Sequence, residues 1–580
     1  DAEVAFFIDD EHHGRGMATV LLEYLAVAAR EAGISGFTAS VLPQNRKMLG
    51  VFTQAGFTAH SHFEEGVIEV ELGIEPTPEA LAAIEARAAT AESRSVRRIL
   101  APGSIAVVGA SREPGTIGHQ VFHQLVARGF QGPVYPVNRT ATYVASVRAW
   151  SSVLDVPGEL DLAVICVPAD QVLRVVEECA VKRVQALIVL SSGFADRDHE
   201  GELAQERLVA YARRHGMRLI GPAALGVINT DPAVRMHATF FGVEPLPGRI
   251  GLMAQSGVIG AAIIDGARQL GLGISSFVAV GNKADVSGND LLRYWQDDPA
   301  TDVAMLYLES FGNPSKFSRT ARALSRVKPV VAVKVGGRLG DHWDEPEGWP
   351  PDATGAALLE QTGVIRVDNL TQMFHTAGVL AHQPLPAGNR VAVITNSWGP
   401  AWLAVDALKA GGLDPVEPID LSNMAAPERF TEALTQVYDA HEVDAVLVIY
   451  APSVATHYRR VGTAIREAAR HPHAVTTVAC LLGQHGPSTL ADGEERIPQF
   501  PFPEEAAAAL SRVVGYAAWR AQAEGTQLEL LDDDLEQARS LVAGWLADES
   551  LRVGGRRWLD PLEAAELLAT AGLAPVDQHL

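Results

Sequence analysis

The stretch SIAVVGASREPGTIG, residues 104–118, decides the fold of the largest part of this chain. It opens with an apolar run that predicts a buried strand, and a helix-length amphipathic stretch follows the turn. Small residues in such a turn let backbone N–H groups approach a phosphate, and the helix directs its N-terminal dipole at the same anion. The candidate ligand contacts are the small, hydroxyl-bearing and cationic residues of the turn: Gly109, Ala110, Ser111, Arg112, Thr116 and Gly118.

The residues after the next predicted strand indicate which phosphate-bearing ligand would fit. Residues 134–137 are followed by Asn138 and Arg139, where a fold that holds a ribose diol would place an acidic residue. The turn also matches Gly-x-Gly-x-x-Gly poorly, which argues against a general dinucleotide site. An amide and a cation favour an additional phosphate, so we expect coenzyme A, with its 3′-phosphate, rather than NAD.

Three series of β-branched runs predict an α/β fold of doubly wound parallel sheets. Helix-length stretches separate the runs, and the ligands of such sheets bind at the carboxyl ends of the strands. The predicted strands are 104–108, 134–137, 162–167, 186–190 and 218–220, then 249–253, 276–280, 303–308 and 330–334, then 391–395, 445–449 and 475–479.

The first residues carry a second strand-turn-helix pattern. A strand-like run at 2–8 contains Glu3, the turn HGRGMA spans 13–18, and a helix is predicted over 18–32. The small residues suit a pyrophosphate, and a carboxylate on the preceding strand is placed to take a proton from an incoming ammonium. The alternative is a purely structural turn, since such turns are common between strands and helices.

Residues 1–71 resemble the back half of the GNAT acetyltransferase fold, whose cofactor motif is Gln/Arg-x-x-Gly-x-Gly/Ala. The resemblance implies that Glu3 is the general base. His13 stands in place of Gln or Arg, which removes one side-chain contact and leaves the backbone cradle. We expect a fragment, because the first three strands of that fold are absent and the first residue is Asp rather than Met. The implied acetyl-CoA contacts are His13, Gly14, Arg15, Gly16, Met17, Ala18 and Asn45.

From residue 104 onward the chain resembles NDP-forming acyl-CoA synthetases, relatives of succinyl-CoA synthetase. In that family the first domain binds CoA, and a histidine in a mobile loop carries phosphate to a nucleotide bound in an ATP-grasp domain. The resemblance adds Pro168 to the implied CoA contacts. The matching blocks are Gly109-Ala110-Ser111-Arg112, Val134-Tyr135-Pro136-Val137-Asn138, Val167-Pro168-Ala169, Ser191-Ser192-Gly193-Phe194, Gly221-Pro222, Ala254-Gln255-Ser256-Gly257 and Gly281-Asn282-Lys283-Ala284-Asp285.

The chain departs from that family where phosphate would be carried. The family's Ser-His-Thr-Gly-Ala loop matches residues 352–356, so Ala353 occupies the phosphohistidine position. His342 lies in the same loop and is a weak substitute, because a histidine in a polar loop is more often simply solvated. Glu309, which matches the acid that orients the phosphohistidine, is left without its partner. Trp398 crowds the turn that is Gly-Gly-Pro-Gly in the family, so we expect the ligase chemistry to be lost.

Composition limits the remaining classes of partner. The net charge is −23 and the pI about 5.2, which argue against nucleic acid or an anionic membrane surface. Three cysteines in 580 residues make neither a disulfide framework nor zinc spacing, so we expect a cytoplasmic protein and no metal. No signal peptide or long apolar span is evident in the sequence.

The predicted organisation has six parts. They are 1–74, the C-terminal part of a GNAT domain; 75–100, a helical linker; 101–238, a CoA-binding Rossmann-like domain; 239–386 and 387–525, two flavodoxin-like succinyl-CoA ligase-like domains; and 526–580, a linker and the start of an ATP-grasp-like region. ATP or ADP is expected only if a functional ATP-grasp region follows.

The two resemblances together imply an acetyl-CoA-dependent N-acetyltransferase acting on protein lysine, with a CoA-binding regulatory region. Its expected partners are acetyl-CoA, a protein substrate that can itself be an acyl-CoA synthetase, and further copies of the chain in a homo-oligomer. Two alternatives stay open. One is an ADP-forming acyl-CoA ligase, and the other is a non-catalytic CoA-sensing module.

Overall fold

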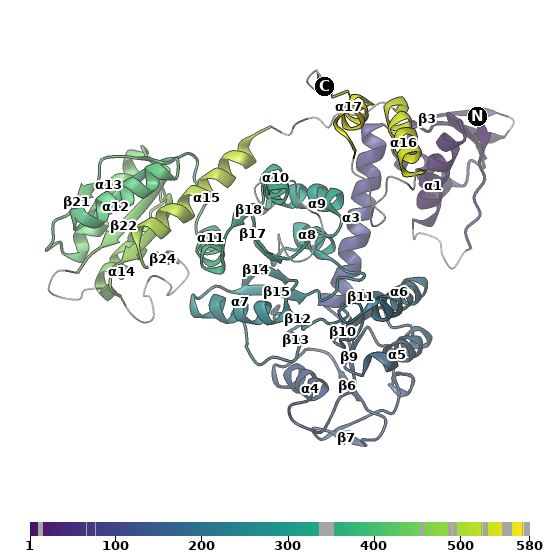
Figure 1. Ribbon diagram of the computed structural model, residues 1–580, viewed down its shortest axis with the longest axis horizontal. Helices are drawn as coiled ribbons and strands as arrows, with labels where there is room; N and C mark the ends of the chain where they lie inside the picture. Colours follow the sequence, from purple (N-terminus) through teal and green to yellow (C-terminus); the bar gives the residue numbers. More distant parts are fainter. Residues whose placement is uncertain are drawn as a thin grey trace. The chain divides into compact units, whose positions relative to one another are not determined.

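A computed structural model of the protein describes residues 1–9, 16–64, 66–75, 77–335, 353–452, 458–484, 490, 496–523, 525, 532–547, 559–570 and 572–573 (Figure 1). The chain divides into two compact units, Asp1–Arg520 and Ala521–Leu580. The second unit has two described helices, α16 (Asp532–Ala547) and α17 (Pro561–Thr570), which pack on each other. Among the described helices none is both long and apolar enough to cross a membrane.

The first unit begins with a four-stranded sheet in the order β1-β2-β4-β3. Its elements are β1 (Ala2–Glu3), α1 (Met17–Glu31), β2 (Gly36–Val41), α2 (Arg46–Gln54), β3 (Thr58–Glu64) and β4 (Val67–Gly73). The strand predicted over 2–8 is shorter than expected. β1 pairs with β2 in parallel through Glu3, and the last backbone bond between them is Val4 N to Thr38 O, at 2.8 Å. Sequence pattern predicts extended chain, but a strand also requires a paired ladder.

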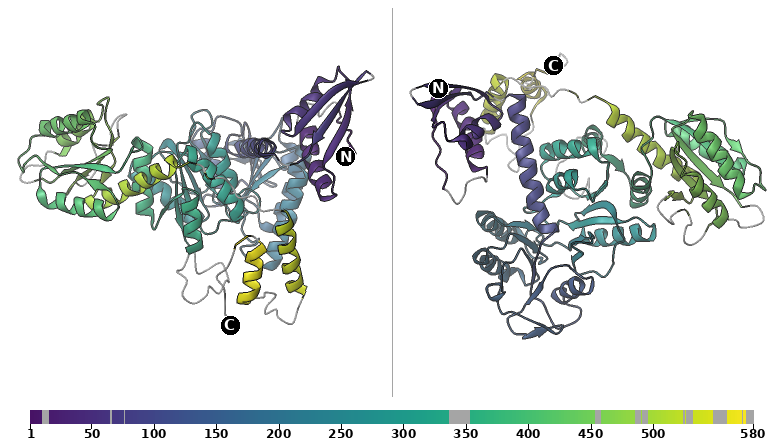
Figure 2. Two further views of the ribbon diagram at one scale, coloured as in Figure 1. Left: turned by 90° about the horizontal axis from the view of Figure 1, so that it is seen from above. Right: turned by 180° about the vertical axis from the view of Figure 1, so that it is seen from behind.

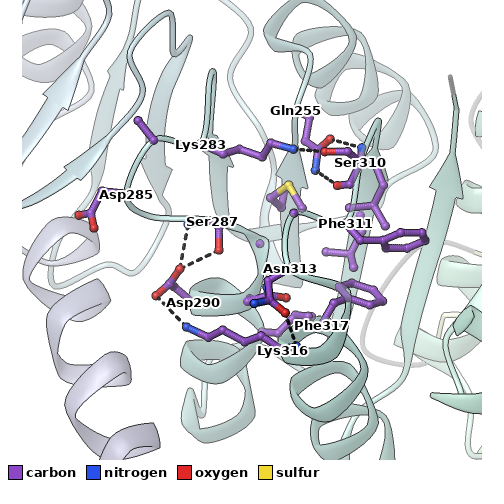
Figure 3. Close-up of a pocket in the computed structure, with 18 of the residues that line it drawn as sticks. Gln255, Lys283, Asp285, Ser287, Asp290, Ser310, Phe311, Asn313, Lys316 and Phe317 are labelled. Carbon is purple, nitrogen blue, oxygen red and sulfur yellow. Dashed lines mark hydrogen bonds and ion pairs between the residues drawn. The ribbon is translucent and has the colours of Figure 1, made fainter. Parts of the chain in front are cut away.

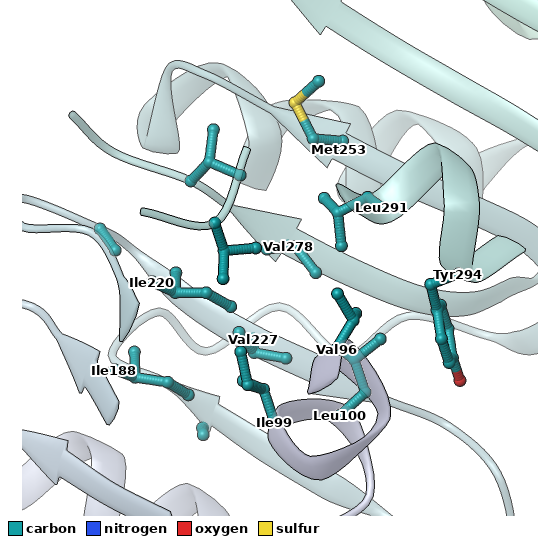
Figure 4. Close-up of a cluster of buried hydrophobic side chains, with 14 of the residues drawn as sticks. Val96, Ile99, Leu100, Ile188, Ile220, Val227, Met253, Val278, Leu291 and Tyr294 are labelled. Carbon is teal, nitrogen blue, oxygen red and sulfur yellow. The ribbon is translucent and has the colours of Figure 1, made fainter. Parts of the chain in front are cut away.

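A single helix, α3 (Pro78–Leu100), follows this sheet and confirms the helix predicted at 75–100. Thr77 caps it by accepting a hydrogen bond from Ala80 N at 3.1 Å. The helix is more than a linker, because it packs on α8 (Gly288–Asp297) and the apolar residues near its end, Val96, Ile99 and Leu100, are fully buried. Figure 4 shows Val96, Ile99 and Leu100 among side chains of two different sheets.

The five strands predicted first form one parallel sheet, β6-β5-β9-β10-β11. We call it the first sheet, and the four-stranded sheet before it the N-terminal sheet. When the strands are numbered along the chain, their order in the sheet is 2-1-3-4-5. The second strand, β6, is added on one side of β5, and the later strands are added on the other side, beginning with β9. The elements are β5 (Ile105–Val108), α4 (Ile117–Ala127), β6 (Val134–Val137), β7 (Tyr143–Val144), β8 (Val147–Arg148), η2 (Val153–Asp155), β9 (Leu162–Ile165), α5 (Ala169–Lys182), β10 (Ala186–Val189), α6 (His199–Arg214) and β11 (Arg218–Ile220).

The second sheet contains the four strands predicted for it and three more. Its order is β13-β12-β15-β14-β16-β17-β18, and β12 and β13 are antiparallel additions at one edge. The elements are β12 (Gly226–Asn229), β13 (Met236–Thr239), β14 (Pro247–Ala254), α7 (Gly257–Gln269), β15 (Ile274–Ala279), α8, β16 (Val303–Leu308), α9 (Pro314–Val327), β17 (Val330–Lys334), α10 (Ala353–Gln361), β18 (Ile365–Val367) and α11 (Leu370–His382).

The third sheet has the same 2-1-3-4-5 order. Two short strands, both paired with the first strand, together take the place of strand 2. Alternate residues of its first strand are buried on opposite faces: Val391 and Val393 pack with α12 and α15, and Ala392 and Ile394 with α13 and α14. Figure 2 shows helices on both faces of this sheet, which is drawn in green. Both faces being covered explains the unbroken apolar runs in the sequence. The elements are β19 (Arg390–Thr395), α12 (Trp398–Ala410), β20 (Asp414–Pro415), β21 (Ile419–Asp420), α13 (Pro427–Ala440), β22 (Ala445–Tyr450), α14 (Tyr458–Ala468), β23 (Thr476–Leu481), β24 (Gln499–Phe500) and α15 (Pro503–Ala521).

Candidate functional site

The turn after β5 has the tight geometry that a phosphate loop needs. Gly109 has a φ of +90°, and a Cβ there would lie 3.0 Å from the carbonyl oxygen of Cys166. A Cβ on Gly118, in the first turn of α4, would lie 2.0 Å from the carbonyl oxygen of Gly109. Both glycines are therefore required, because together they bring the start of α4 against the turn.

Several polar residues predicted to contact ligand are used to hold the turn itself. Asn138 donates from Nδ2 to Ala110 O at 2.7 Å, and its Oδ1 accepts from the backbone of the segment that follows. Thr116 donates from Oγ1 to Glu113 O at 2.9 Å, and Ser111 Oγ accepts from Glu113 N at 3.1 Å. Asn138 thus joins the turns after β5 and β6, which keeps the backbone N–H groups in place.

A cleft of about 570 Å³ opens beside this turn. We call it the hairpin cleft, and its lining residues are Arg112, Thr140, Thr142, Tyr143, Ala145 and Ser146. Thr142, Tyr143 and Ser146 were not predicted from the sequence. The hairpin β7–β8 that carries them turns at Ala145 and Ser146, with φ of 45° and 64°, in place of the usual Asn-Gly signal.

Two helices begin at this edge without a side-chain cap. Thr116 precedes α4 and Pro168 precedes α5, and neither side chain caps its helix. The two helices follow β5 and β9, which are neighbours in the sheet. The strand order reverses between these two strands, which makes this edge the topological switch point. This is where doubly wound sheets bind ligands, and two uncapped N-termini favour an anion there. Arg139 is exposed on the loop after β6.

The N-terminal candidate site is partly described. Glu3 is exposed on β1, beside Thr38 of β2. Gly16 is the N-cap of α1 with a φ of 77°, and Met17 and Ala18 form the first turn of that helix. Asn45 caps α2 by accepting from Met48 N at 3.1 Å, which gives it a structural role. His13, Gly14 and Arg15 lie outside the described residues.

A second cavity, also of about 570 Å³, lies at the carboxyl ends of β14, β15 and β16 (Figure 3). Gln255 organises one wall, because its Oε1 accepts from Glu309 N at 2.6 Å and from Ser310 N at 2.8 Å. Lys283 points into the same wall and donates to the Ser310 hydroxyl. We call this cavity the lysine pocket, and its charged lining residues are Glu92, Arg213, Arg218, Lys283, Asp285, Asp290 and Lys316.

Most charges of the lysine pocket are paired. Arg218 donates to Asp285 Oδ2 at 2.8 Å and to Asp290 Oδ1 at 3.1 Å, and both carboxylates are nearly inaccessible to solvent. It also donates to Ser95 Oγ at 2.7 Å, which ties α3 to β11. Burial tends to raise the pKa of Asp290, but Arg218, Lys316 and the hydrogen bonds from Ser287 together outweigh it and the pKa is lowered. The network therefore joins α3, the first sheet and the second sheet.

The residues that bear on the expected loss of the phosphate carrier lie where the described part of the chain is interrupted. Ala353 is the first residue of α10, and the structure does not describe its side chain. His342 lies outside the described residues. Trp398 begins α12, is 45% exposed, and stacks on Trp402 with ring centroids 5.8 Å apart. An indole therefore lies at the start of α12. In the described part of the chain no group of His, Cys, Asp and Glu could hold a metal ion.

Three family models match the chain. The model described as a CoA binding domain matches residues 103–230, the succinyl-CoA ligase like flavodoxin domain matches 247–380, and the acetyltransferase (GNAT) family matches 2–57. The fold and these matches define an α/β protein with a CoA-binding domain, a succinyl-CoA ligase-like flavodoxin domain and a GNAT acetyltransferase match at its N-terminus. Helix α3 lies outside all three matched ranges.

Known relatives define the family more narrowly. The chain is 32% identical over 461 residues to the acetate–CoA ligase (ADP-forming) I subunit alpha of Pyrococcus furiosus, covering 74% of this chain and 99% of that protein. It is 31% identical to the solved apo dinucleotide forming acetyl-coenzyme A synthetase 1 of Candidatus Korarchaeum cryptofilum, with a TM-score of 0.68, covering 73% of this chain and 98% of that one. The chain belongs to the ADP-forming acyl-CoA synthetase family.

A further solved structure matches only the N-terminal region. The GNAT domain of S. lividans PAT is 51% identical over 13% of this chain and 42% of that chain, with a TM-score of 0.12.

Proposed function

We propose that the intact protein is an acetyl-CoA-dependent N-acetyltransferase that modifies protein lysine, and that its acyl-CoA synthetase-like region regulates it by binding CoA. The observation that carries the proposal is the combination in one chain of a GNAT match at 2–57 and a CoA-binding match at 103–230. Two CoA sites in one protein allow the supply of acetyl-CoA to control the transfer of its acetyl group.

In this proposal the N-terminal sheet carries the chemistry. Glu3 takes the proton from the substrate ammonium, directly or through a water, because only the neutral amine can attack the thioester carbonyl. The uncapped N-terminus of α1, with Gly16 as its N-cap, faces the pyrophosphate of acetyl-CoA together with the backbone of the preceding turn. The side chain at Glu3 is exposed, as a base that meets a protein substrate must be.

The synthetase-like region supplies a second CoA site at the hairpin cleft. Arg112 gives it a cation, and the uncapped starts of α4 and α5 give it two positive dipole ends. Ala353 at the phosphohistidine position supports a silent ligase, since a methyl group cannot carry phosphate.

The test is mass spectrometry of acyl-CoA synthetases incubated with acetyl-CoA and the intact protein. We expect acetyl-lysine on a synthetase with the wild type and a loss of roughly 100-fold or more in rate with Glu3→Gln, the range for general base catalysis. Equal rates for both proteins would remove Glu3 from its role. A hyperbolic dependence on acetyl-CoA with one CoA bound per chain would count against regulation.

A second candidate function is favoured by the relatives. The chain covers 99% of a Pyrococcus furiosus ligase subunit, and a related Korarchaeum synthetase has been solved in complex with phosphate and ADP. An ADP-forming ligase would need a phosphate carrier other than Ala353. Formation of ATP from acetyl-CoA, ADP and phosphate, or an acid-labile phosphoryl group on the protein, would establish the ligase and overturn the silent region. If the protein bound CoA but showed no ATP formation, no phosphoryl group and no acetyl transfer, the remaining interpretation would be a non-catalytic CoA-sensing module.

A further inference from the structure

The lysine pocket holds two lysines that differ in ion pairing. Lys316 is ion-paired, with its Nζ 2.7 Å from Glu92 Oε1 and 3.8 Å from Asp290 Oδ1. Lys283 forms no ion pair with a described residue, and its Nζ donates to the Ser310 hydroxyl instead. Figure 3 shows the two side chains on different walls of the one cavity. An ammonium without a bound carboxylate is the one that can release its proton and act as a nucleophile.

The backbone holds Lys283 firmly in that position. Its φ is 55°, and a Cβ on Gly281 would lie 2.2 Å from the carbonyl oxygen of Pro222, so the loop is pressed against the end of β11. Asn282 donates to Asp196 Oδ1 at 3.1 Å, and Asp196 accepts from Gly193 N at 2.9 Å. The loop that carries Lys283 is thereby bonded to the loops at the carboxyl edge of the first sheet.

That edge is continuous with the candidate CoA site. β5, β9, β10 and β11 are consecutive neighbours in the sheet. Three strand spacings separate β5 from β11, which is roughly 14 Å. The long pantetheine arm of CoA ends in the thioester, so a CoA whose phosphates lie at the start of α4 can extend its acyl group along the edge toward the lysine pocket.

We propose that Lys283 is a self-acylation site, which takes the acyl group from a CoA thioester held by the first sheet. The inference rests on CoA binding at the hairpin cleft, as in the proposed function, and adds a covalent acceptor to it.

The step balances with groups already present. The Lys283 ammonium gives one proton to the surrounding water, and the amine lone pair attacks the thioester carbonyl carbon. The carbon–sulfur bond breaks, and the leaving thiolate takes the second proton of the amine. The products are an acyl-lysine amide and free CoA. Burial lowers the pKa of Lys283, an effect that Glu309 partly opposes and Lys334 reinforces, so neutral amine is more accessible than in an exposed lysine.

The experiment incubates the full chain with acetyl-CoA alone and maps acetyl groups by peptide mass spectrometry over time. We expect acetylation at Lys283 at a rate at least tenfold above that at Lys316, which serves as the matched control in the same cavity. Lys283→Arg should remove the mark without changing CoA affinity measured by calorimetry. Glu3→Gln should keep it, because the donor is the CoA of the first sheet.

The outcomes separate the two proposals. CoA binding without acetyl-Lys283, or equal labelling of both lysines, overturns the self-acylation site and leaves the proposed function untouched. Loss of the mark in Glu3→Gln shows that the GNAT site made it and also overturns the inference. Absence of any CoA binding that depends on Arg112 removes the regulatory site, and the inference with it.

Discussion

The hairpin cleft and the lysine pocket have the same volume, about 570 Å³ each, but they are built differently. The phosphate turn beside the hairpin cleft depends on backbone: two glycines that tolerate no Cβ and two uncapped helix N-termini, with the exposed Arg112 shared between turn and cleft. The lysine pocket depends on charged side chains that come from α3, α6, β11, α8, α9 and the loop between β15 and α8. A backbone site is encoded by one short stretch of chain, whereas a side-chain site exists only after distant segments have packed.

The largest expected effect is at the charge network of the lysine pocket. Arg218→Met leaves Asp285 and Asp290, which are 3% and 6% exposed, without their shared cation. We expect a loss of about 3 kcal/mol, the lower end for a broken buried pair, because Arg213 still bonds Asp285. The difference in the free energy of unfolding between variant and wild type, measured by urea denaturation, tests this value.

The matched control is Arg249→Met, which breaks a pair with Asp302 in which the side chains are 56% and 48% exposed. An exposed pair contributes roughly 0–1 kcal/mol. If both substitutions cost the same, the lysine pocket does not depend on its buried charges.

The next effect is at the hairpin cleft. Gly118→Ala places a Cβ 2.0 Å from Gly109 O, and we expect a loss of about 1–3 kcal/mol in stability as α4 moves away, together with weaker CoA binding. Thermal unfolding and calorimetry measure the two quantities. Gly515→Ala is the control, because nothing lies within 4 Å of a Cβ there, and it should be neutral or slightly stabilising. Normal CoA binding by Gly118→Ala would show that the cradle is not the ligand site.

A smaller effect is expected from the one cation of the hairpin cleft. Arg112→Ala should weaken CoA binding by about 1.5 kcal/mol, roughly tenfold, with little change in thermal stability, because a charged hydrogen bond to phosphate is lost. Arg174, exposed on α5 and outside both cavities, offers the control substitution Arg174→Ala. Equal affinities for the two variants would place the phosphates elsewhere.

The smallest effect is confined to acid. The pKa of Asp290 is lowered in the folded protein, since Arg218, Lys316 and the hydrogen bonds from Ser287 together outweigh its burial. A depressed carboxyl pKa stabilises the fold above the ordinary value of 3.8, and this contribution is lost as pH falls through the folded value. Unfolding measured between pH 5 and 3 should therefore depend less steeply on pH in Asp290→Asn than in the wild type. An unchanged slope would contradict the lowered pKa.

The parts of the fold that were predictable have local causes. β6, β11, β16 and β17 have the predicted bounds, since apolar runs between helix-length stretches define buried parallel strands. The antiparallel strands β12 and β13 were missed, because a short edge pair carries no strong period. The hairpin β7–β8 was missed for a similar reason, since Ala145 and Ser146 are not turn-forming residues by type.

By itself the sequence determined the α/β class, the glycine turn after β5 and the helix at 78–100, because each depends on residues adjacent in the chain. Only the tertiary structure decided that the end of α3 is buried between two sheets, that the first and third sheets share one strand order, and that Lys283 and Lys316 lie in one cavity with different partners. The physical reason is that burial and ion pairing are set by the segments that meet in space, and the spacing of residues along a chain does not specify which segments those are.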